Sequence, residues 1–184
     1  LHKYKAIWII FEYMNVILKN SVNEKVHFDN NNGLQLFLKR EDKIHEVISG
    51  NKYRKLKYNL IKAKELGYNG LLTFGGAYSN HIPAVAYAAK KNGFKSLSFI
   101  RGDEIANNYL ENPTLKYSHN LGMKFNFLSR SNYKLKTNED FLDKLRNKFI
   151  DYFLIPEGGT NALGVLGCEE ILNHNDKKFD YICC

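Results

Sequence analysis

A lysine follows a Ser-Gly-Asn turn in this sequence and could either do chemistry or be an ordinary solvated residue. Lys52 stands at the expected start of a helix in the stretch "EVISGNKYRKLKYNL", with Arg54 and Lys55 close behind it. A lysine that acts as a nucleophile must present a neutral amine, whereas a free lysine side chain has a pKa of about 10.4. Burial and neighbouring positive charges lower that pKa. Taken alone, the local sequence favours a solvated lysine at a helix start, and a chemical role needs support from other segments.

Two further segments place polar side chains between a glycine pair and a helix. In "LLTFGGAYSNHIPAVAYAAKK" the polar residues are Ser79, Asn80 and His81, and in "IPEGGTNALGVLGCEEI" they are Thr160 and Asn161. Each segment fits a tight turn before a capped helix, because Ser and Asn are good N-caps. Each also fits a ligand site, because glycine lets a ligand approach the backbone and helix-start N–H groups attract anions. The repetition of this arrangement favours one shared site.

The remaining polar residues show no spacing typical of a metal or nucleotide site. His45, His119 and His174 have no Cys, Asp or Glu at metal-ligand spacing. Neither glycine segment matches a Walker A or a GxGxxG pattern. Glu169 and Glu170 fit the polar face of a helix better than an acid and base pair. We therefore expect neither a metal nor a nucleotide.

Alternating strands and helices must position these residues. Hydrophobic residues at helical spacing, such as Leu56, Leu60 and Ala63, predict a helix that ends at Gly67. The alternation predicts an α/β fold with mostly parallel sheets and helices on both faces. The expected strands are residues 34–38, 70–74, 95–100, 124–128, 152–156 and 179–184, and the expected helices are residues 52–67, 80–91, 113–122, 138–149 and 164–173.

Composition limits the classes of function. Of the 184 residues, 44% are hydrophobic and 25% are charged, which is typical of globular proteins. The net charge of +8 raises the question of nucleic-acid binding, but the lysines are scattered and form no arginine-rich stripe. We therefore expect no nucleic-acid partner. The cysteines, Cys168, Cys183 and Cys184, form no disulfide pattern, which favours the reducing cytoplasm, and we expect them to be small buried hydrophobic residues.

The amino-terminal stretch opens with Leu1 rather than with methionine. Its hydrophobic run is interrupted by Glu12 and Asn15 and is too short for a transmembrane helix. It also lacks the small-residue cleavage site of a signal peptide. We expect translation to begin at Met14, with residues 1–13 as a non-native or disordered extension, and we expect no association with a membrane.

Three segments in this order, "KRED…SGNKYRKLKYNL", "TFGGAYSNH" and "IPEGGTNALG", resemble the 1-aminocyclopropane-1-carboxylate deaminase / D-cysteine desulfhydrase family of pyridoxal 5'-phosphate enzymes. The similarity runs from about Leu34 to the end of the chain, and the combination of motifs is highly specific. It implies the tryptophan-synthase-β-like fold, fold type II, with the cofactor between two α/β domains. By that resemblance, residues 14–76 and 158–184 are parts of the large cofactor domain, and residues 77–157 form the small domain.

The resemblance also implies roles for individual residues. Lys52 matches the lysine that forms the Schiff base with the cofactor. Lys55 matches a contact to the cofactor phosphate, and Asn80 matches the residue that hydrogen-bonds the 3′-oxygen. Ser79 and His81 match positions that contact the substrate carboxylate, and Ser79 is also expected to take part in proton transfer. The expected substrate-binding residues are Ser79, Asn80, His81, Gly159 and Thr160.

The function implied by the resemblance is the removal of ammonia from a small amino acid, with release of an α-keto acid, by a homodimer. The chain stops at an expected strand, before the glycine-rich phosphate loop of the family, which indicates an amino-terminal fragment that binds the cofactor weakly. Two alternatives stay open: another enzyme of this fold, such as a serine/threonine dehydratase or a cysteine-synthase-like enzyme, and a non-catalytic scaffold. The motifs do not separate ring-opening deamination from desulfhydration.

Overall fold

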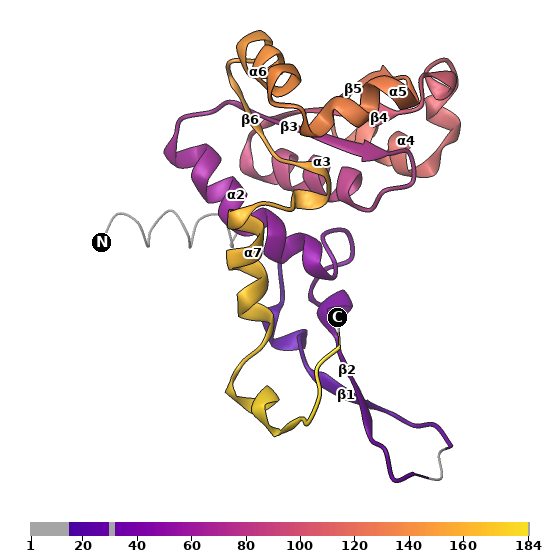
Figure 1. Cartoon of the computed structure of the whole chain (residues 1–184), viewed down its shortest axis with the longest axis vertical. Coiled ribbons are helices and arrows are strands. Elements are labelled where there is room, and N and C mark those ends of the chain that lie inside the picture. Colours follow the sequence, from indigo (N-terminus) through magenta and orange to yellow (C-terminus); the bar gives the residue numbers. More distant parts are fainter. Residues whose placement is uncertain (1–14, 30–31, 184) are drawn as a thin grey trace.

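Four parallel strands in the order β5-β4-β3-β6 form the main sheet of the protein. The computed structural model describes residues 15–29 and 32–183. The sheet and the helices around it confirm the predicted α/β fold, and Figure 1 shows helices above and below the sheet. The strands are β3 (Gly70–Gly76), β4 (Lys95–Arg101), β5 (Met123–Leu128) and β6 (Tyr152–Leu154).

Helices cover both faces of this sheet because successive strand residues point to opposite sides. Leu71 and Ile100 belong to one buried hydrophobic cluster, and Leu72 and Phe74 belong to another. The two clusters lie on opposite faces of the sheet, which explains why its strands are hydrophobic along their length. The first face carries α3 (His81–Asn92) and α4 (Pro113–Asn120), and the second carries α5 (Arg130–Tyr133) and α6 (Glu139–Lys148).

Helices α2 (Asn51–Glu65) and α7 (Ala162–Cys168) lie side by side outside the sheet (Figure 1). Glycine allows this close contact, since a Cβ atom added to Gly167 would overlap the carbonyl oxygen of Arg54. The hydrophobic face predicted for α2 is confirmed, because Leu56, Leu60 and Ala63 are all buried. The contact brings two of the three motif segments together.

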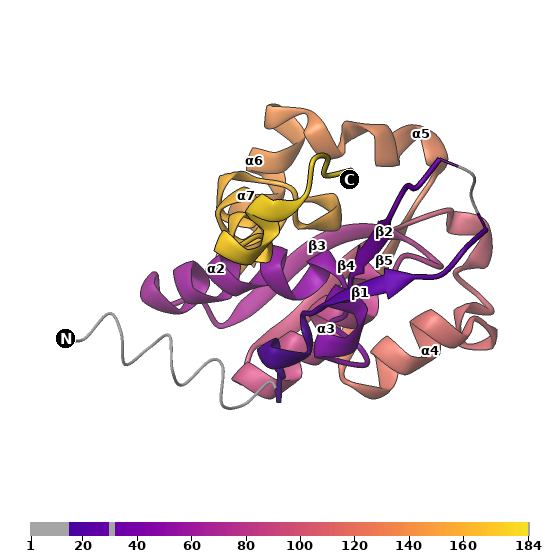
Figure 2. The same ribbon diagram turned by 90° about the horizontal axis from the view of Figure 1, so that it is seen from below.

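A β-hairpin, which the sequence interpretation missed, extends away from the main sheet (Figures 1 and 2). Its antiparallel strands are β1 (Asn23–Val26) and β2 (Leu36–Lys39), and the second overlaps the strand predicted at residues 34–38. An Asn-Gly pair at Asn32 and Gly33 lies in the loop between the strands, where such pairs commonly mark a turn. Leucines at alternate positions of its second arm are exposed: Leu34, Leu36 and Leu38.

Short 3₁₀ helices connect these elements. Helix η2 leads into α2, η6 leads into α7, and η7 and η8 follow α7 toward the C-terminal end. The 3₁₀ helices are η1 (Leu18–Asn20), η2 (Glu41–Ile44), η3 (Asp103–Ile105), η4 (Tyr109–Glu111), η5 (Lys134–Thr137), η6 (Glu157–Gly159), η7 (Glu169–Ile171) and η8 (His174–Lys178).

Two expectations for the C-terminal end are wrong. Residues 179–183 form no strand, and Tyr181 is 88% exposed, because no described strand lies beside them to pair with their backbone. Strand propensity depends on such neighbours rather than on the residues alone. Cys183 is exposed and Cys168 is half-buried, so neither is a fully buried hydrophobic residue, and Cys184 lies outside the described residues.

Other expectations concern the ends of the chain and its division into domains. The extension expected at residues 1–13 lies outside the described residues. The division into domains stays a prediction; the main sheet joins β3 to strands on the other side of the boundary placed at residue 76. No helix within the described part of the chain is both long and apolar enough to cross a membrane.

Candidate active site

Lys52 is the second residue of α2 and follows a turn that only glycine adopts easily. Gly50 has a φ of 60°, and its N–H donates to the carbonyl of Glu41 at 2.9 Å. The half-buried Lys52 donates from Nζ to Oδ1 of Asn51 at 2.8 Å. Burial and, next, the positive charge of Lys55 lower the pKa of the Lys52 amine below its ordinary value. The environment therefore favours the neutral, nucleophilic form of Lys52.

The second motif turns from the end of β3 into α3. Gly75 allows this turn, because an added Cβ would overlap the side chain of Ile82. Ser79 Oγ accepts a hydrogen bond from the backbone N–H of His81 at 3.3 Å. Asn80 occupies the N-cap position, but its side chain does not cap the helix and is exposed. Helix capping therefore does not explain Asn80, whose amide makes no hydrogen bond to any described residue.

His81 is buried and held in one tautomer. Thr73 Oγ1 donates to the carbonyl of Ile155 at 2.8 Å, so it can only accept from Nε2 of His81, which lies 2.8 Å away. Nε2 therefore carries the ring proton, and Nδ1 presents a lone pair that no described atom engages. Burial, followed by the charges of Lys52 and Lys55, lowers the pKa of His81 to about 3. The imidazole is neutral at physiological pH and can only accept at Nδ1.

The third motif lies in contact with the first two. Gly159 has a φ of 71°, and an added Cβ would lie 3.2 Å from Cβ of Lys55 and 3.6 Å from Cε1 of His81. The neighbouring Thr160 accepts a hydrogen bond at Oγ1 from Nζ of Lys55 at 3.1 Å. Gly159 thus lies against both Lys55 and His81, and a side chain at this position would crowd Lys55.

Paired amides fix this loop in place. Asn161 accepts at Oδ1 from the N–H of Gly164 at 2.8 Å, and this bond caps α7 as the capping interpretation predicted. Its Nδ2 donates to Oδ1 of Asn59 at 2.8 Å, and Nδ2 of Asn59 donates back at 3.2 Å. Because Asn59 is a fully buried residue of α2, the loop is tied to the helix that carries Lys52.

These contacts bring most of the predicted site residues together. Lys55, His81, Gly159 and Thr160 meet directly, and the charge of Lys52 acts on His81. Ser79 and Asn80 lie immediately before the start of α3. The predicted roles of these residues toward a cofactor or substrate remain predictions.

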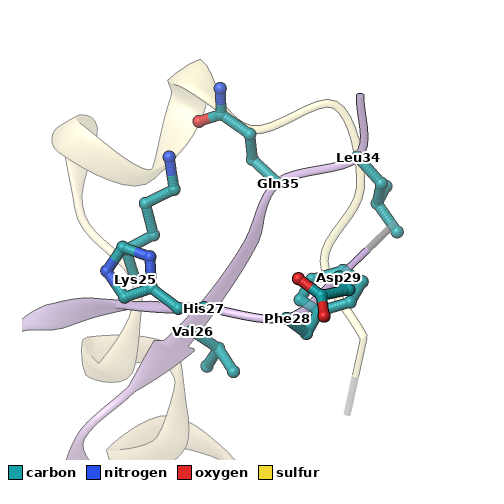
Figure 3. Close-up of a pocket in the computed structure, with 7 residues that line it drawn as sticks. All are labelled: Lys25, Val26, His27, Phe28, Asp29, Leu34 and Gln35. Carbon is teal, nitrogen blue, oxygen red and sulfur yellow. The ribbon is translucent and has the colours of Figure 1, made fainter. Parts of the chain in front are cut away.

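Two open cavities lie in the described part of the chain. One, of about 450 Å³, lies between the arms of the hairpin; Figure 3 shows its lining side chains, which include none of the predicted site residues. The other, of about 460 Å³, lies at the carboxyl ends of β3 and β4 and includes Ser79 among its lining residues. Ligands of parallel sheets bind at this end of the strands, so the second cavity extends the candidate active site.

Sequence reasoning missed two residues of this region. Thr73 is a polar residue inside a buried strand, two positions before the glycine pair, and it sets the tautomer of His81. Arg101 is the last residue of β4 and lines the second cavity. The position of Arg101 at a strand end was the available signal, since polar residues there face the ligand side of the sheet.

Comparison with known proteins shows similarity along most of the chain. No family model matches it. Proteins of Thermotoga maritima and Pyrococcus horikoshii, both named "Putative 1-aminocyclopropane-1-carboxylate deaminase", are 35% and 31% identical over 160 and 156 residues, which are 83% and 82% of this chain and 50% and 46% of theirs. The "Bifunctional D-cysteine desulfhydrase/1-aminocyclopropane-1-carboxylate deaminase, mitochondrial" of Arabidopsis thaliana is 30% identical over 82% of this chain and 41% of its own length. The chain thus spans about half the length of the curated relatives it matches.

Solved structures have the same fold. A crystal structure of an ACC deaminase homologue matches with a TM-score of 0.68 and 24% identity, over 94% of this chain and 54% of that chain. A hydrogen sulfide-producing enzyme from Fusobacterium nucleatum matches with a TM-score of 0.53 and 13% identity, over 79% and 44% of the two chains. At these identities the likeness concerns the fold alone. Over about half of their length, the chain is thus similar in sequence to proteins named 1-aminocyclopropane-1-carboxylate deaminase and D-cysteine desulfhydrase, and it shares the fold of an ACC deaminase homologue.

Proposed function

We propose that the protein uses pyridoxal 5'-phosphate, held covalently by Lys52, to release ammonia and an α-keto acid from a small amino acid. The observation that carries this proposal is a half-buried lysine of lowered pKa, beside the place where all three motif segments meet. The names of the relatives support it, since they describe deaminases of 1-aminocyclopropane-1-carboxylate and a desulfhydrase of D-cysteine.

The residues present fit this cofactor. Lys52 supplies the amine, the exposed amide of Asn80 suits the 3′-oxygen, and the Lys55 ammonium suits the phosphate. Gly159 leaves room between Lys55 and His81, and the open Nδ1 of His81 is a buried acceptor that a ligand donor would satisfy. When bound, the cofactor supplies the electron sink for carbanion chemistry.

In this proposal, the amine of Lys52 and the hydroxyl of Ser79 transfer protons. The Lys52 amine is a base whose pKa is lowered by burial and by Lys55. Ser79 accepts the N–H of His81 at its hydroxyl oxygen and so keeps its own proton available to donate. The neutral ring of His81 donates its proton to Thr73 in a hydrogen bond and does not act as an acid.

The setting of the reaction is also part of this proposal. The free thiols of Cys168 and Cys183 support a reducing compartment such as the cytoplasm. Because the Arabidopsis relative is named as mitochondrial, organelle fractionation is the test of this location. A homodimer is proposed as the assembly, to be checked by light scattering. The proposed partner of the protein is its small amino-acid substrate.

Product assays test the function. The protein is incubated with pyridoxal phosphate and separately with 1-aminocyclopropane-1-carboxylate, D-cysteine, L-serine and L-threonine, and α-keto acid, ammonia and sulfide are measured. We expect product from one or both of the first two substrates. Product from L-serine or L-threonine alone would identify a dehydratase of the same fold, and the absence of product from all four would favour a non-catalytic scaffold.

Covalent labelling tests the role of Lys52. Borohydride treatment in the presence of pyridoxal phosphate should fix the cofactor to the peptide that contains Lys52, as read by mass spectrometry. Lys52→Ala should abolish both the label and product formation, whereas Lys64→Ala, an exposed position of the same helix, should change neither. Full activity of Lys52→Ala would refute the proposal.

A further inference from the structure

The "KRED" stretch of the first motif segment contains a buried carboxylate, that of Glu41, which is the first residue of η2. Carboxylates are almost never buried unless they are paired. Oε2 of Glu41 accepts from Nε of Arg54 at 2.8 Å, and Oε1 accepts from Nη2 of Arg54 at 3.1 Å and from the hydroxyl of Ser21. Two parallel hydrogen bonds of this kind fix the direction of a guanidinium as well as its distance.

The backbone of Glu41 holds the start of the helix that carries Arg54. Its carbonyl accepts from the N–H of Gly50 at 2.9 Å, and Gly50 is the N-cap residue of α2. Glycine has no side chain with which to cap a helix. The turn before α2 is therefore tied to Glu41 through its backbone. We call the contacts of Glu41 with Gly50 and Arg54 the Glu41 clamp.

The two contacts of the Glu41 clamp lie on either side of Lys52 in the chain. Gly50 comes before Lys52, and Arg54 comes after it. Because an α-helix turns by about 100° per residue, Arg54 projects from nearly the opposite face of α2. The Lys52 amine donates to Oδ1 of the adjacent Asn51 at 2.8 Å, a contact that does not tie it to another element. The position of the amine therefore depends on the backbone that carries it.

We infer that Glu41 is a positioning residue for Lys52: its carboxylate and its carbonyl together fix the first turn of α2, and this turn sets where the amine lies. The identity of Lys52 as a Schiff-base lysine rests on the function proposed above, whereas the clamp rests on the contacts of Glu41. Without the clamp the first turn can move, and water reaches the amine. Burial is the main cause of the lowered pKa of Lys52, so loss of the clamp should raise that pKa.

Three titratable groups face the Lys52 amine from the helices around it. Lys55 belongs to α2, Cys168 ends α7, and His81 begins α3. Burial raises the pKa of the Cys168 thiol and lowers the pKa of His81 to about 3. Both groups are therefore neutral between about pH 5 and 8. A change in the pH profile of Lys52 within this range reports on the amine itself.

The sign of the effect separates position from charge. Glu41→Gln removes a negative charge, and by charge alone this change would disfavour the ammonium form and lower the pKa of Lys52. Loss of the clamp raises the pKa instead, because the amine becomes more exposed to water. A shift of the Lys52 profile to higher pH therefore identifies a movement of the amine.

Acetylation by acetic anhydride measures the neutral amine without the cofactor. The rate at Lys52 is read by peptide mass spectrometry between about pH 6 and 9, at a temperature where circular dichroism shows each variant folded. In Glu41→Gln the rate near pH 7 should fall about threefold or more. Leu145→Ala removes a buried side chain of α6, in the hydrophobic cluster on the far face of the sheet, and so destabilises the protein away from α2. It should keep the wild-type profile.

A double variant keeps the test decisive if Glu41→Gln does not fold, since that change leaves Arg54 buried without its closest carboxylate. Glu41→Leu combined with Arg54→Met replaces the ion pair by an apolar contact of similar volume, which proteins often tolerate. Its unfolding midpoint should stay near that of the wild type. Its acetylation profile should still shift to higher pH, because apolar contacts have no preferred direction.

Three results would overturn the inference. The first is a profile of Glu41→Gln that does not move or that moves to lower pH. The second is an equal shift in Leu145→Ala, which would show that any loss of stability has the same effect. The third is a wild-type profile in the double variant, which would show that packing alone positions the amine.

Enzyme kinetics distinguish this inference from the proposed function. With an active substrate, the acid limb of the kcat profile should move to higher pH in Glu41→Gln, while KM stays within about twofold of the wild-type value. Turnover with unchanged kcat and acetylation profiles would refute the clamp and leave the proposed function standing. A shifted acetylation profile in a protein without any turnover would support the clamp and refute the proposed function.

Discussion

The amine of Lys52 and the imidazole of His81 are shifted toward their neutral forms by related causes. Burial acts first on both, and the charge of Lys55 adds to the effect on each. Burial of such groups costs free energy of folding, because water stabilises their charged forms. Shifts of this kind gather at functional sites. Here they lie on neighbouring helix starts, which is what a shared site requires.

Removal of the charge on Lys55 should raise the pKa of Lys52. A positive neighbour disfavours the ammonium form, so Lys55→Met relieves that repulsion and preserves the aliphatic stem beside Gly159. The pH dependence of Lys52 acetylation, followed by peptide mass spectrometry, should move to higher pH. Lys64→Met should leave the profile in place. A shift to lower pH, or none, would show that Lys55 does not act on Lys52.

The neutral state of His81 makes stability depend on pH. Its pKa is about 3 in the folded protein and about 6.5 in an unfolded chain, so the unfolded chain binds one more proton between these values. Stability is therefore lost as pH falls from about 6.5 toward 3, by up to about 1.4 kcal/mol per pH unit.

His81→Gln removes this titration. Urea unfolding at pH 7, 6 and 5 should show the stability of the wild-type protein falling relative to that of His81→Gln as the pH decreases. The exposed His174→Gln is the matched control and should follow the wild type. A difference between wild type and His81→Gln that stays constant across this range would contradict the assignment.

Residue types and their order predicted which side chains gather at the site, but not how they are protonated. Lys55, His81 and Gly159 were candidates because of the motifs around them, and the structure brings them together. The tautomer of His81 depends on Thr73, which bonds a carbonyl 82 positions further along the chain. No local pattern contains such a contact, since it arises only when β3 and β6 pair.

The packing of α7 on α2 depends on the absence of side chains. Gly167 meets the backbone of Arg54, and Gly164 meets the backbone of Gly159. Because α2 carries Lys52 and the segment before α7 carries Thr160, this contact sets the distance between two motifs. The glycines are therefore structural requirements of the site, although they would touch no ligand.

Gly167→Ala should destabilise the protein and loosen the third motif. Its methyl group would overlap the carbonyl of Arg54, and overpacking of this kind costs about 1–3 kcal/mol. Denaturant unfolding should show a lowered midpoint. Val165→Ala changes an exposed position of the same helix and should alter stability by less than about 0.5 kcal/mol. A wild-type midpoint for Gly167→Ala would mean that the helices can separate without cost.

Helices and strands were predictable where a hydrophobic pattern and a stop signal coincided. The helix predicted over residues 52–67 is α2, and its buried face is the predicted one. The strand predicted at residues 179–184 failed because backbone pairing needs a neighbour, which the pattern "FDYICC" cannot supply. The hairpin was missed because β1, with the sequence "NEKV", has little hydrophobic alternation and is stabilised by distant contacts.

Buried polar contacts join segments that are distant in the chain. Arg54 is almost fully buried, and its Nε donates to Glu41 at 2.8 Å. Glu170 accepts from Nζ of Lys57 at 2.6 Å and lies 3.6 Å from Nη1 of Arg54. These contacts join η2 and η7 to α2, the helix that carries the candidate Schiff-base lysine in its first turn.

Asp176 anchors the C-terminal segment to the hairpin. Its carboxylate accepts from Nζ of Lys39 at 3.1 Å and from Nδ2 of Asn23 at 2.6 Å. Asp176→Asn removes the charge of a nearly buried group and should release η8 from both strands. Hydrogen exchange should then rise at least about tenfold in residues 36–39 and 174–178, with unchanged protection in β3 and β4. Glu65→Gln, on the surface of α2, should change neither region. Equal exchange in wild type and Asp176→Asn would exclude this anchoring role.

The topology determines which parts of the chain can fold while the ribosome is still making it. All four strands of the main sheet lie between residues 70 and 154, so the sheet can assemble as soon as β6 emerges. The hairpin is made before the sheet, but its anchor Asp176 is made 137 positions after Lys39. During that interval the hairpin displays its row of exposed leucines without its stabilising contact. We therefore expect chaperones to bind the hairpin during this interval.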